Sequence, residues 1–134
     1  MGYYFKYYLD KKKDLVSEVT KERREMYQTY VDLILNIWMG TKVGKADPSD
    51  HVIVLQDFFK KNTMYASPKV IKSLSSLFQY MYAHDGKPSD TKKVIILMTR
   101  TIKDMRSDLG LSNKGLGENG EELIRPLIKD WDLL

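Results

Sequence analysis

Residues 10–39 read DKKKDLVSEVTKERREMYQTYVDLILNIWM, a stretch without proline or glycine that decides the fold. As a helix it would be about 45 Å long. Its first part is charged on most sides and its last dozen residues are mostly apolar. Apolar side chains recur in alternating steps of three and four, the spacing of one helical face, with Arg23 at the missing step: Val16, Val19, Met26, Tyr30, Leu33 and Ile37. The pattern predicts a long helix with one end in water and the other in a core.

A second helix is predicted to begin at Asp47, a capping residue that Pro48 follows at the first helical position. The next residues, HVIVL at 51–55, are rich in β-branched side chains and could also form a strand. Val52 and Leu55 keep helical spacing, however, and no partner strand is visible elsewhere in the sequence. The sequence therefore favours a helix here.

Two further helices carry their own start and stop signals. Ser67 and Pro68 open the third helix, which runs to an HDGKP breaker. Ser89 or Asp90 opens the fourth, and Gly110 stands where a left-handed C-terminal cap is expected. Each of the two helices places its apolar residues on one stripe.

The end of the chain is predicted to hold a loop, residues 111–120, of which the glycine-rich part, residues 115–120, is a flexible connector. A short helix is predicted for residues 121–131, which Pro126 kinks or starts. The whole chain is predicted to be all-α, a single domain of residues 1–134. We expect an antiparallel bundle of four main helices with a long first helix and a short C-terminal helix, residues 1–24 forming a projecting extension. Tetratricopeptide-like repeats are the main alternative, but no self-similar unit of about 34 residues is present.

Composition limits the function classes. A chain of 134 residues with 43% hydrophobic and 30% charged residues is typical of one globular domain. The net charge of +4 is modest, and the only local excess is seven Lys and Arg against four Asp and Glu in residues 1–24. The absence of cysteine excludes disulfides, thiolate metal sites and cysteine nucleophiles, and it fits a cytoplasmic protein.

The sequence contains no constellation that predicts catalysis. The stretch GLGENG at residues 115–120 matches G-x-G-x-x-G formally, but a dinucleotide site needs a strand before it and a βαβ unit after it. His51 and His84 lack the spacing of a zinc helix; an enzyme or metal site would require Asp50 and Asp85 to join them. We therefore predict no enzyme activity, no cofactor and no metal.

Three short motifs form a resemblance to a known group. Residues 64–74, MYASPKVIKSL, resemble a YAS-x-x-V-x-x-x-L segment, and residues 105–112, MRSDLGLS, resemble an MRKDLGL segment with Ser107 in place of lysine. Together with the Arg-x-x-x-Tyr element from Arg23 to Tyr27, they are similar to a loose group of uncharacterised bacterial and phage-encoded helical proteins. In many of that group a membrane helix precedes the long helix, which implies a membrane-proximal position. No catalytic residue comes with the resemblance.

The motif residues allow two interpretations. As fold determinants, Ser67 caps a helix, Met105 and Leu109 face the core, and Gly110 ends a helix. In the competing interpretation, polar residues of the fourth helix form a partner-binding surface. Together with the aromatic and lysine-rich N-terminus, the candidate interaction residues are Tyr4, Lys6, Tyr7, Tyr8, Lys11, Lys12, Lys13, Arg100, Arg106 and Asp108.

Our leading hypothesis is a non-enzymatic interaction or oligomerisation module that binds a protein partner or a second copy of itself. The N-terminal aromatics and lysines also suit a membrane surface, where rings lie at headgroup depth and lysines meet anionic lipid. A nucleic-acid-binding protein that uses the basic N-terminal helix is a further alternative. No small-molecule partner is predicted.

Overall fold

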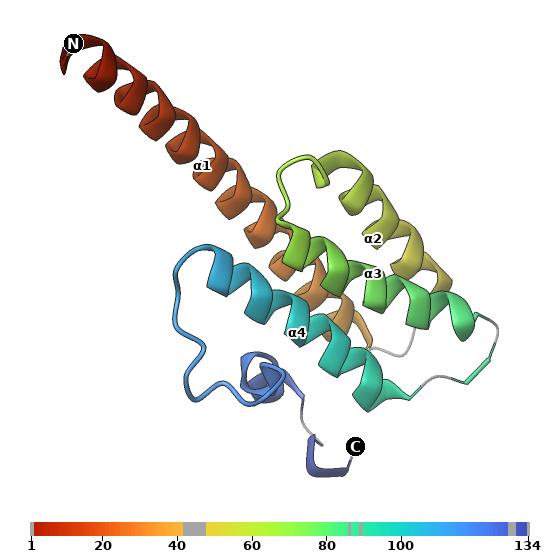
Figure 1. Ribbon diagram of the computed structural model, residues 1–134. Helices are drawn as coiled ribbons and strands as arrows, with labels where there is room; N and C mark the ends of the chain where they lie inside the picture. The colour runs from red at the N-terminus through yellow and green to blue at the C-terminus, as the bar shows by residue number, and fades with distance from the viewer. Residues whose placement is uncertain (1, 42–47, 86, 89, 129–130, 134) are drawn as a thin grey trace.

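The protein is built from α-helices. The computed structural model describes residues 2–41, 48–85, 87–88, 90–128 and 131–133, and in these ranges it contains no strand (Figure 1). The helices are α1 (Gly2–Thr41), α2 (Pro48–Asn62), α3 (Pro68–Ala83) and α4 (Thr91–Asp108). The all-α prediction is confirmed, and the ambiguous HVIVL stretch lies within α2.

Successive helices run in alternating directions, and α3 and α4 lie side by side over most of their length (Figure 1). One core joins all four helices, because side chains from each of them are completely buried: Tyr30, Ile34, Leu55, Leu74 and Ile95 are examples. The Tyr30 and Phe58 rings, with centroids 5.7 Å apart, join α1 to α2. The predicted apolar faces therefore form the core, although the side chain of Trp38 lies outside the described residues.

The predicted helix starts are confirmed where the structure describes them. The Ser67 hydroxyl accepts a hydrogen bond from the Val70 N–H at 3.3 Å, which satisfies a free donor in the first turn of α3. Asp90 caps α4 in the same way and accepts from the Lys92 N–H at 3.0 Å. The alternative cap Ser89 and the predicted cap Asp47 lie outside the described residues.

The end of α4 is a Schellman motif. The Gly110 N–H donates to the Ser107 carbonyl at 3.0 Å, and the Leu111 N–H donates to the Arg106 carbonyl at 2.9 Å. Gly110 has φ +76°, the left-handed conformation that the sequence predicted for this position. The chain therefore reverses sharply and runs back along α4.

The predicted C-terminal helix is wrong. Three short 3₁₀ turns replace it, η1 (Glu121–Leu123), η2 (Arg125–Leu127) and η3 (Trp131–Leu133). Pro126 has no N–H to donate within a helix, and its ring obstructs the preceding turn, so the apolar spacing does not suffice for an α-helix. Ile124, between the first two turns, is buried and attaches this segment to the core.

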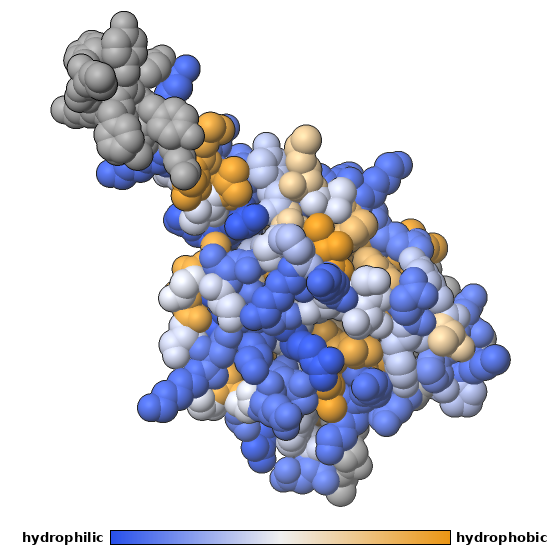
Figure 2. Space-filling model, viewed as in Figure 1, coloured by the Kyte–Doolittle hydropathy of each residue, from blue (hydrophilic) through white to orange (hydrophobic). Residues whose placement is uncertain are grey.

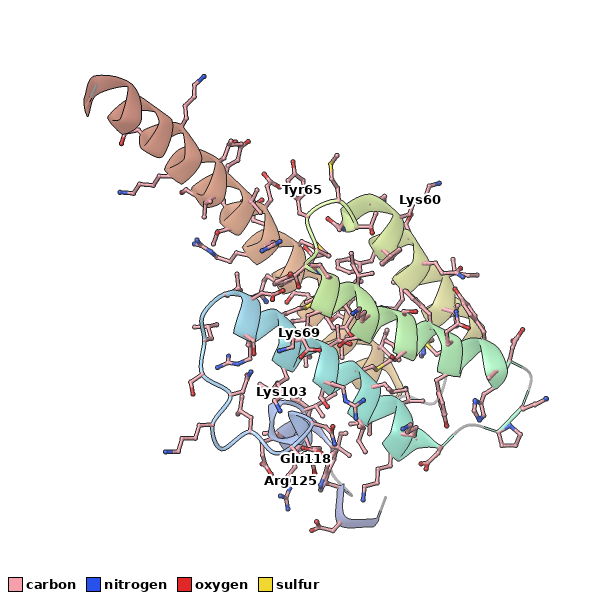
Figure 3. All side chains as sticks on the ribbon, viewed as in Figure 1. Lys60, Tyr65, Lys69, Lys103, Glu118 and Arg125 are labelled. Atoms are coloured by element: carbon pink, nitrogen blue, oxygen red, sulfur yellow. The ribbon has the colours of Figure 1, made fainter. Side chains whose placement is uncertain are left out.

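The glycine-rich segment is anchored to α4, so the prediction of a flexible connector is also wrong. The Thr99 hydroxyl donates to the Asn119 carbonyl at 2.8 Å, and the Lys103 ammonium donates to the Glu118 carbonyl at 2.7 Å. Figure 3 shows Lys103 and Glu118 close together. Gly120 has φ +76° and passes so near α4 that a Cβ there would lie 3.0 Å from the Thr99 carbonyl oxygen.

Replacing Gly120 by alanine should destabilise the protein more than the same change at Gly115. Both glycines have positive φ, which costs an alanine about 1–2 kcal/mol. Only Gly120 lies against a backbone carbonyl, whereas a Cβ at Gly115 meets nothing within 4 Å. Urea unfolding of the two variants tests this difference, and equal losses would show that the segment does not pack closely on α4.

Candidate functional site

The N-terminal part of α1 extends beyond the other helices. α1 has 40 residues and is about 60 Å long, whereas α4, with 18 residues, is about 27 Å long. Figure 1 shows the N-terminal half of α1 pointing away from the rest of the protein. Every described side chain between Asp10 and Glu18 is exposed. This part of α1 therefore has no cover from the described remainder of the chain.

The projecting half of α1 carries exposed apolar side chains. Leu15 is 64% and Val16 is 58% exposed, and Figure 2 shows a hydrophobic patch on this part of the helix. Leu15 shares a helical face with Val19, Met26 and Tyr30, because these residues follow it by four, eleven and fifteen positions, close to whole numbers of helical turns. Met26 and Tyr30 are buried in the core. The core-facing stripe of α1 thus continues outward onto a surface without a partner.

The predicted N-terminal interaction residues lie on this projecting half. Lys11 and Lys13 are exposed. The other members lie on the helical backbone of α1, but their side chains fall outside the described residues: Tyr4, Lys6, Tyr7, Tyr8 and Lys12. The structure therefore places this set on one helix and leaves its interaction role a prediction.

The three sequence motifs meet at one carboxylate. The Tyr27 hydroxyl of α1 donates to the Asp108 Oδ2 atom at 2.6 Å, and the Ser67 hydroxyl donates to the same oxygen at 2.5 Å. The Ser67 N–H in turn donates to the Tyr27 hydroxyl oxygen at 3.3 Å. Tyr27 and Ser67 are only 2% and 7% exposed. We call these three residues the Asp108 cluster.

Arg23 explains the gap in the apolar series of α1. Its Nε–H donates to the carbonyl oxygen of Tyr65 at 2.7 Å, so the guanidinium ties α1 to the turn between α2 and α3. Figure 3 shows Tyr65 at this turn, beside α1. The charged side chain of Arg23 therefore binds the backbone at the point where α1 leaves the domain, and it does not interrupt an apolar contact.

Burial changes the proton affinity of the cluster tyrosine. Removal from water, together with the hydrogen bond to Asp108, raises the pKa of Tyr27, although the hydrogen bonds from Ser67 oppose this effect. Complete burial likewise raises the pKa of Tyr30, whose hydroxyl donates to the Met98 carbonyl at 3.2 Å. Both phenols are therefore neutral hydrogen-bond donors of the fold at physiological pH, not bases.

Arg100, Arg106 and Asp108 do not form one joint polar surface. Arg100 donates to the Asn119 side chain at 2.9 Å, and Arg106 donates to the Asn113 side chain at 3.1 Å. Asp108 belongs to its own cluster. Each residue thus has a separate intramolecular partner, and these contacts support the interpretation of the motifs as fold determinants.

A groove of about 490 Å³ lies between α1 and α4, at the base of the projecting helix. Most of its lining side chains are apolar, and two are arginines: Thr20, Arg24, Tyr27, Gln28, Val31, Ile102, Met105, Arg106, Leu109, Leu111 and Leu123. The sequence analysis missed this groove, because its walls are far apart in the chain. The only signal was that the MRSDLGLS motif supplies Met105, Arg106, Leu109 and Leu111.

The structure gives no support to a metal or enzyme site at the histidines. His84 stacks on Tyr80 with ring centroids 4.1 Å apart, and its Nδ1 lies 2.9 Å from the Tyr80 carbonyl oxygen. Among the described residues no group of three or more His, Asp or Glu side chains is arranged to hold a metal ion. The side chain of Asp50, one of the four residues in that hypothesis, lies outside the described part.

Comparisons with protein-family models, with curated proteins and with solved structures found no match. The resemblance to the bacterial and phage-encoded helical group stays a prediction. Within the described part of the chain, no helix combines the length and the apolar character that a membrane crossing requires.

Changing Tyr27 to phenylalanine should destabilise the protein by about 1–3 kcal/mol, because it removes a buried hydrogen bond to a carboxylate. Combined with Ser67→Ala, the two losses should not add, since both hydroxyls bind the same oxygen. Tyr82→Phe is a matched control, because the Tyr82 hydroxyl accepts an exposed hydrogen bond from the Gln56 side chain and takes no part in the Asp108 cluster. Strict additivity in urea unfolding would contradict a shared carboxylate.

The contribution of Tyr27 to the free energy of unfolding should also decrease at high pH. Because the pKa of Tyr27 is raised in the folded protein, the unfolded chain loses this proton first as the pH rises past the ordinary value of 10.0. The stability that Tyr27 adds is thus fully present below pH 10 and falls above it. The difference in unfolding free energy between the native chain and Tyr27→Phe should therefore narrow from pH 9 to 11. A constant difference would show that the phenol titrates alike in both states.

Proposed function

We propose that the protein is a non-enzymatic helical module that associates with a second copy of itself through the projecting half of α1. The observation that carries this proposal is the exposure of Leu15 and Val16 on a helix that leaves the domain. The lack of cysteine suits such a module to the reducing cytoplasm.

A helix of this kind gains most of its stability from a partner. Most helical stability in proteins comes from packing of an apolar face and not from helix propensity alone. Burial of an exposed Leu or Val side chain contributes about 1.5–3 kcal/mol. The described side chains of the chain itself do not cover Leu15 and Val16, so a second molecule supplies the packing.

The spacing of the apolar residues favours another copy as that molecule. Val16 and Val19 continue the alternating three- and four-residue steps that Met26 and Tyr30 follow in the core. This is the repeat with which helices pair in coiled coils. Two copies related by a two-fold axis bring the same patch together from both sides, which closes the assembly as a dimer.

A membrane surface or a nucleic acid has less support as the partner. Residues 1–24 hold seven basic and four acidic residues, so the net excess on this part of the helix is only three positive charges. Exposed leucine and valine side chains require a dry partner surface, which nucleic acid does not provide. Membrane and nucleic-acid binding are accordingly the alternative outcomes of the test.

Sedimentation velocity over a range of concentrations tests the proposal. We expect the native chain to form dimers that dissociate on dilution and the double variant Leu15→Glu/Val16→Glu to be monomeric, because the carboxylates would be buried without partners. Ile53→Glu is the matched control, since Ile53 on α2 is 61% exposed but lies outside the projecting helix. The control should dimerise as the native chain does.

A native chain that stays monomeric at every concentration would overturn self-association. If that monomer floats with anionic vesicles and deletion of residues 1–13 abolishes flotation, the projecting helix docks on membranes instead. If it binds DNA or RNA with an affinity that falls steeply with salt, the basic residues bind phosphates instead.

A further inference from the structure

The groove between α1 and α4 has the volume of a small-molecule site. Its volume of about 490 Å³ lies within the range of about 300–1,000 Å³ that is usual for ligand pockets. Val31 lines it from α1, Ile102 and Met105 line it from α4, and Leu109 lines it from the C-cap of α4. Leu15 and Val16 are not among its lining residues, so the two proposals concern different residues of α1.

The walls of the groove are held in place by hydrogen bonds to other parts of the domain. Tyr27 is fixed by Asp108, and Leu111 is held by its own N–H, which donates to the Arg106 carbonyl in the Schellman motif that ends α4. The segment that carries Leu123 is anchored to α4 through Thr99. The groove is therefore formed before any ligand arrives, which lowers the entropic cost of binding.

The charged groups of the groove have one sign. Arg24 and Arg106 line it, and no Asp or Glu is among its lining residues. Bonds to the Asn113 side chain and to the Ser112 carbonyl orient the Arg106 guanidinium and occupy two of its five N–H donors. The Asp108 carboxylate, behind Tyr27, is turned to the hydroxyls of its own cluster. The remaining guanidinium donors favour an anionic group.

We propose that this groove binds an amphipathic anion, namely a single unbranched apolar chain that ends in a carboxylate or a phosphate. The chain lies along Val31, Met105 and Leu109, and the head group binds Arg24 and Arg106.

Calorimetric titration of the full-length protein with dodecanoate and with dodecyl phosphate, both below the concentration at which micelles form, tests this site. The two probes separate a free fatty acid from a phosphate head group as the source of the anion. Both should bind at one site, and the difference between their affinities shows whether the arginines prefer a carboxylate or a phosphate. The cationic probe dodecyltrimethylammonium should bind at least tenfold more weakly than either. Circular dichroism before and after titration shows whether the fold is retained.

Two variants locate the site. Arg24→Gln, on an exposed side chain, should weaken both anions about tenfold, which corresponds to the loss of one charge-assisted hydrogen bond. Val31→Trp should fill the groove and abolish binding. Lys72→Gln, an exposed change on α3 outside the groove, should leave both affinities unchanged.

Three results would overturn the proposal. The first is equal affinity for the anionic and cationic probes, which would indicate a purely apolar contact. The second is an unchanged affinity in both Arg24→Gln and Val31→Trp, which would place the ligand elsewhere. The third is binding only where micelles form, which would indicate a detergent effect.

Discussion

One carboxylate oxygen holds three helices of this protein together. Asp108 is the last residue of α4, and its Oδ2 atom accepts hydrogen bonds from Tyr27 on α1 and from Ser67, the N-cap of α3. The partners stand 81 and 41 residues away in the chain. This contact lies near the point at which α1 leaves the domain and its projecting half begins. It places Tyr27 and the end of α4 as facing walls of the groove.

Much of the fold could be predicted because its physical causes are local. The apolar spacing of each helix, the caps at Ser67 and Asp90 and the left-handed Gly110 all act within a few residues, so the sequence shows them directly. The prediction of a helix in the C-terminal segment failed for a reason that is also local. Its apolar spacing suggested a helix, but Pro126 divides it into 3₁₀ turns that Ile124 attaches to the core.

The candidate site could be predicted only in part, because its geometry depends on contacts between distant residues. The motifs drew attention to Tyr27, Ser67 and Asp108, but the sequence could not show that their side chains share one oxygen. Without that contact, a polar surface of Arg100, Arg106 and Asp108 stood as a competing interpretation. The anchoring of the glycine-rich segment was hidden for the same reason, since Thr99 and Asn119 meet only when the chain reverses after Gly110.

Arg23 lies at the boundary between the buried part and the projecting part of α1. An apolar residue at this step would continue the stripe from Val19 to Met26 and would let the core extend along the helix. The arginine instead binds the carbonyl of Tyr65, so the turn between α2 and α3 ends the core there. A polar residue within an apolar seam costs stability but fixes one alignment of the packed helices. Because that alignment is fixed, the other described helices cannot slide outward to cover Leu15 and Val16.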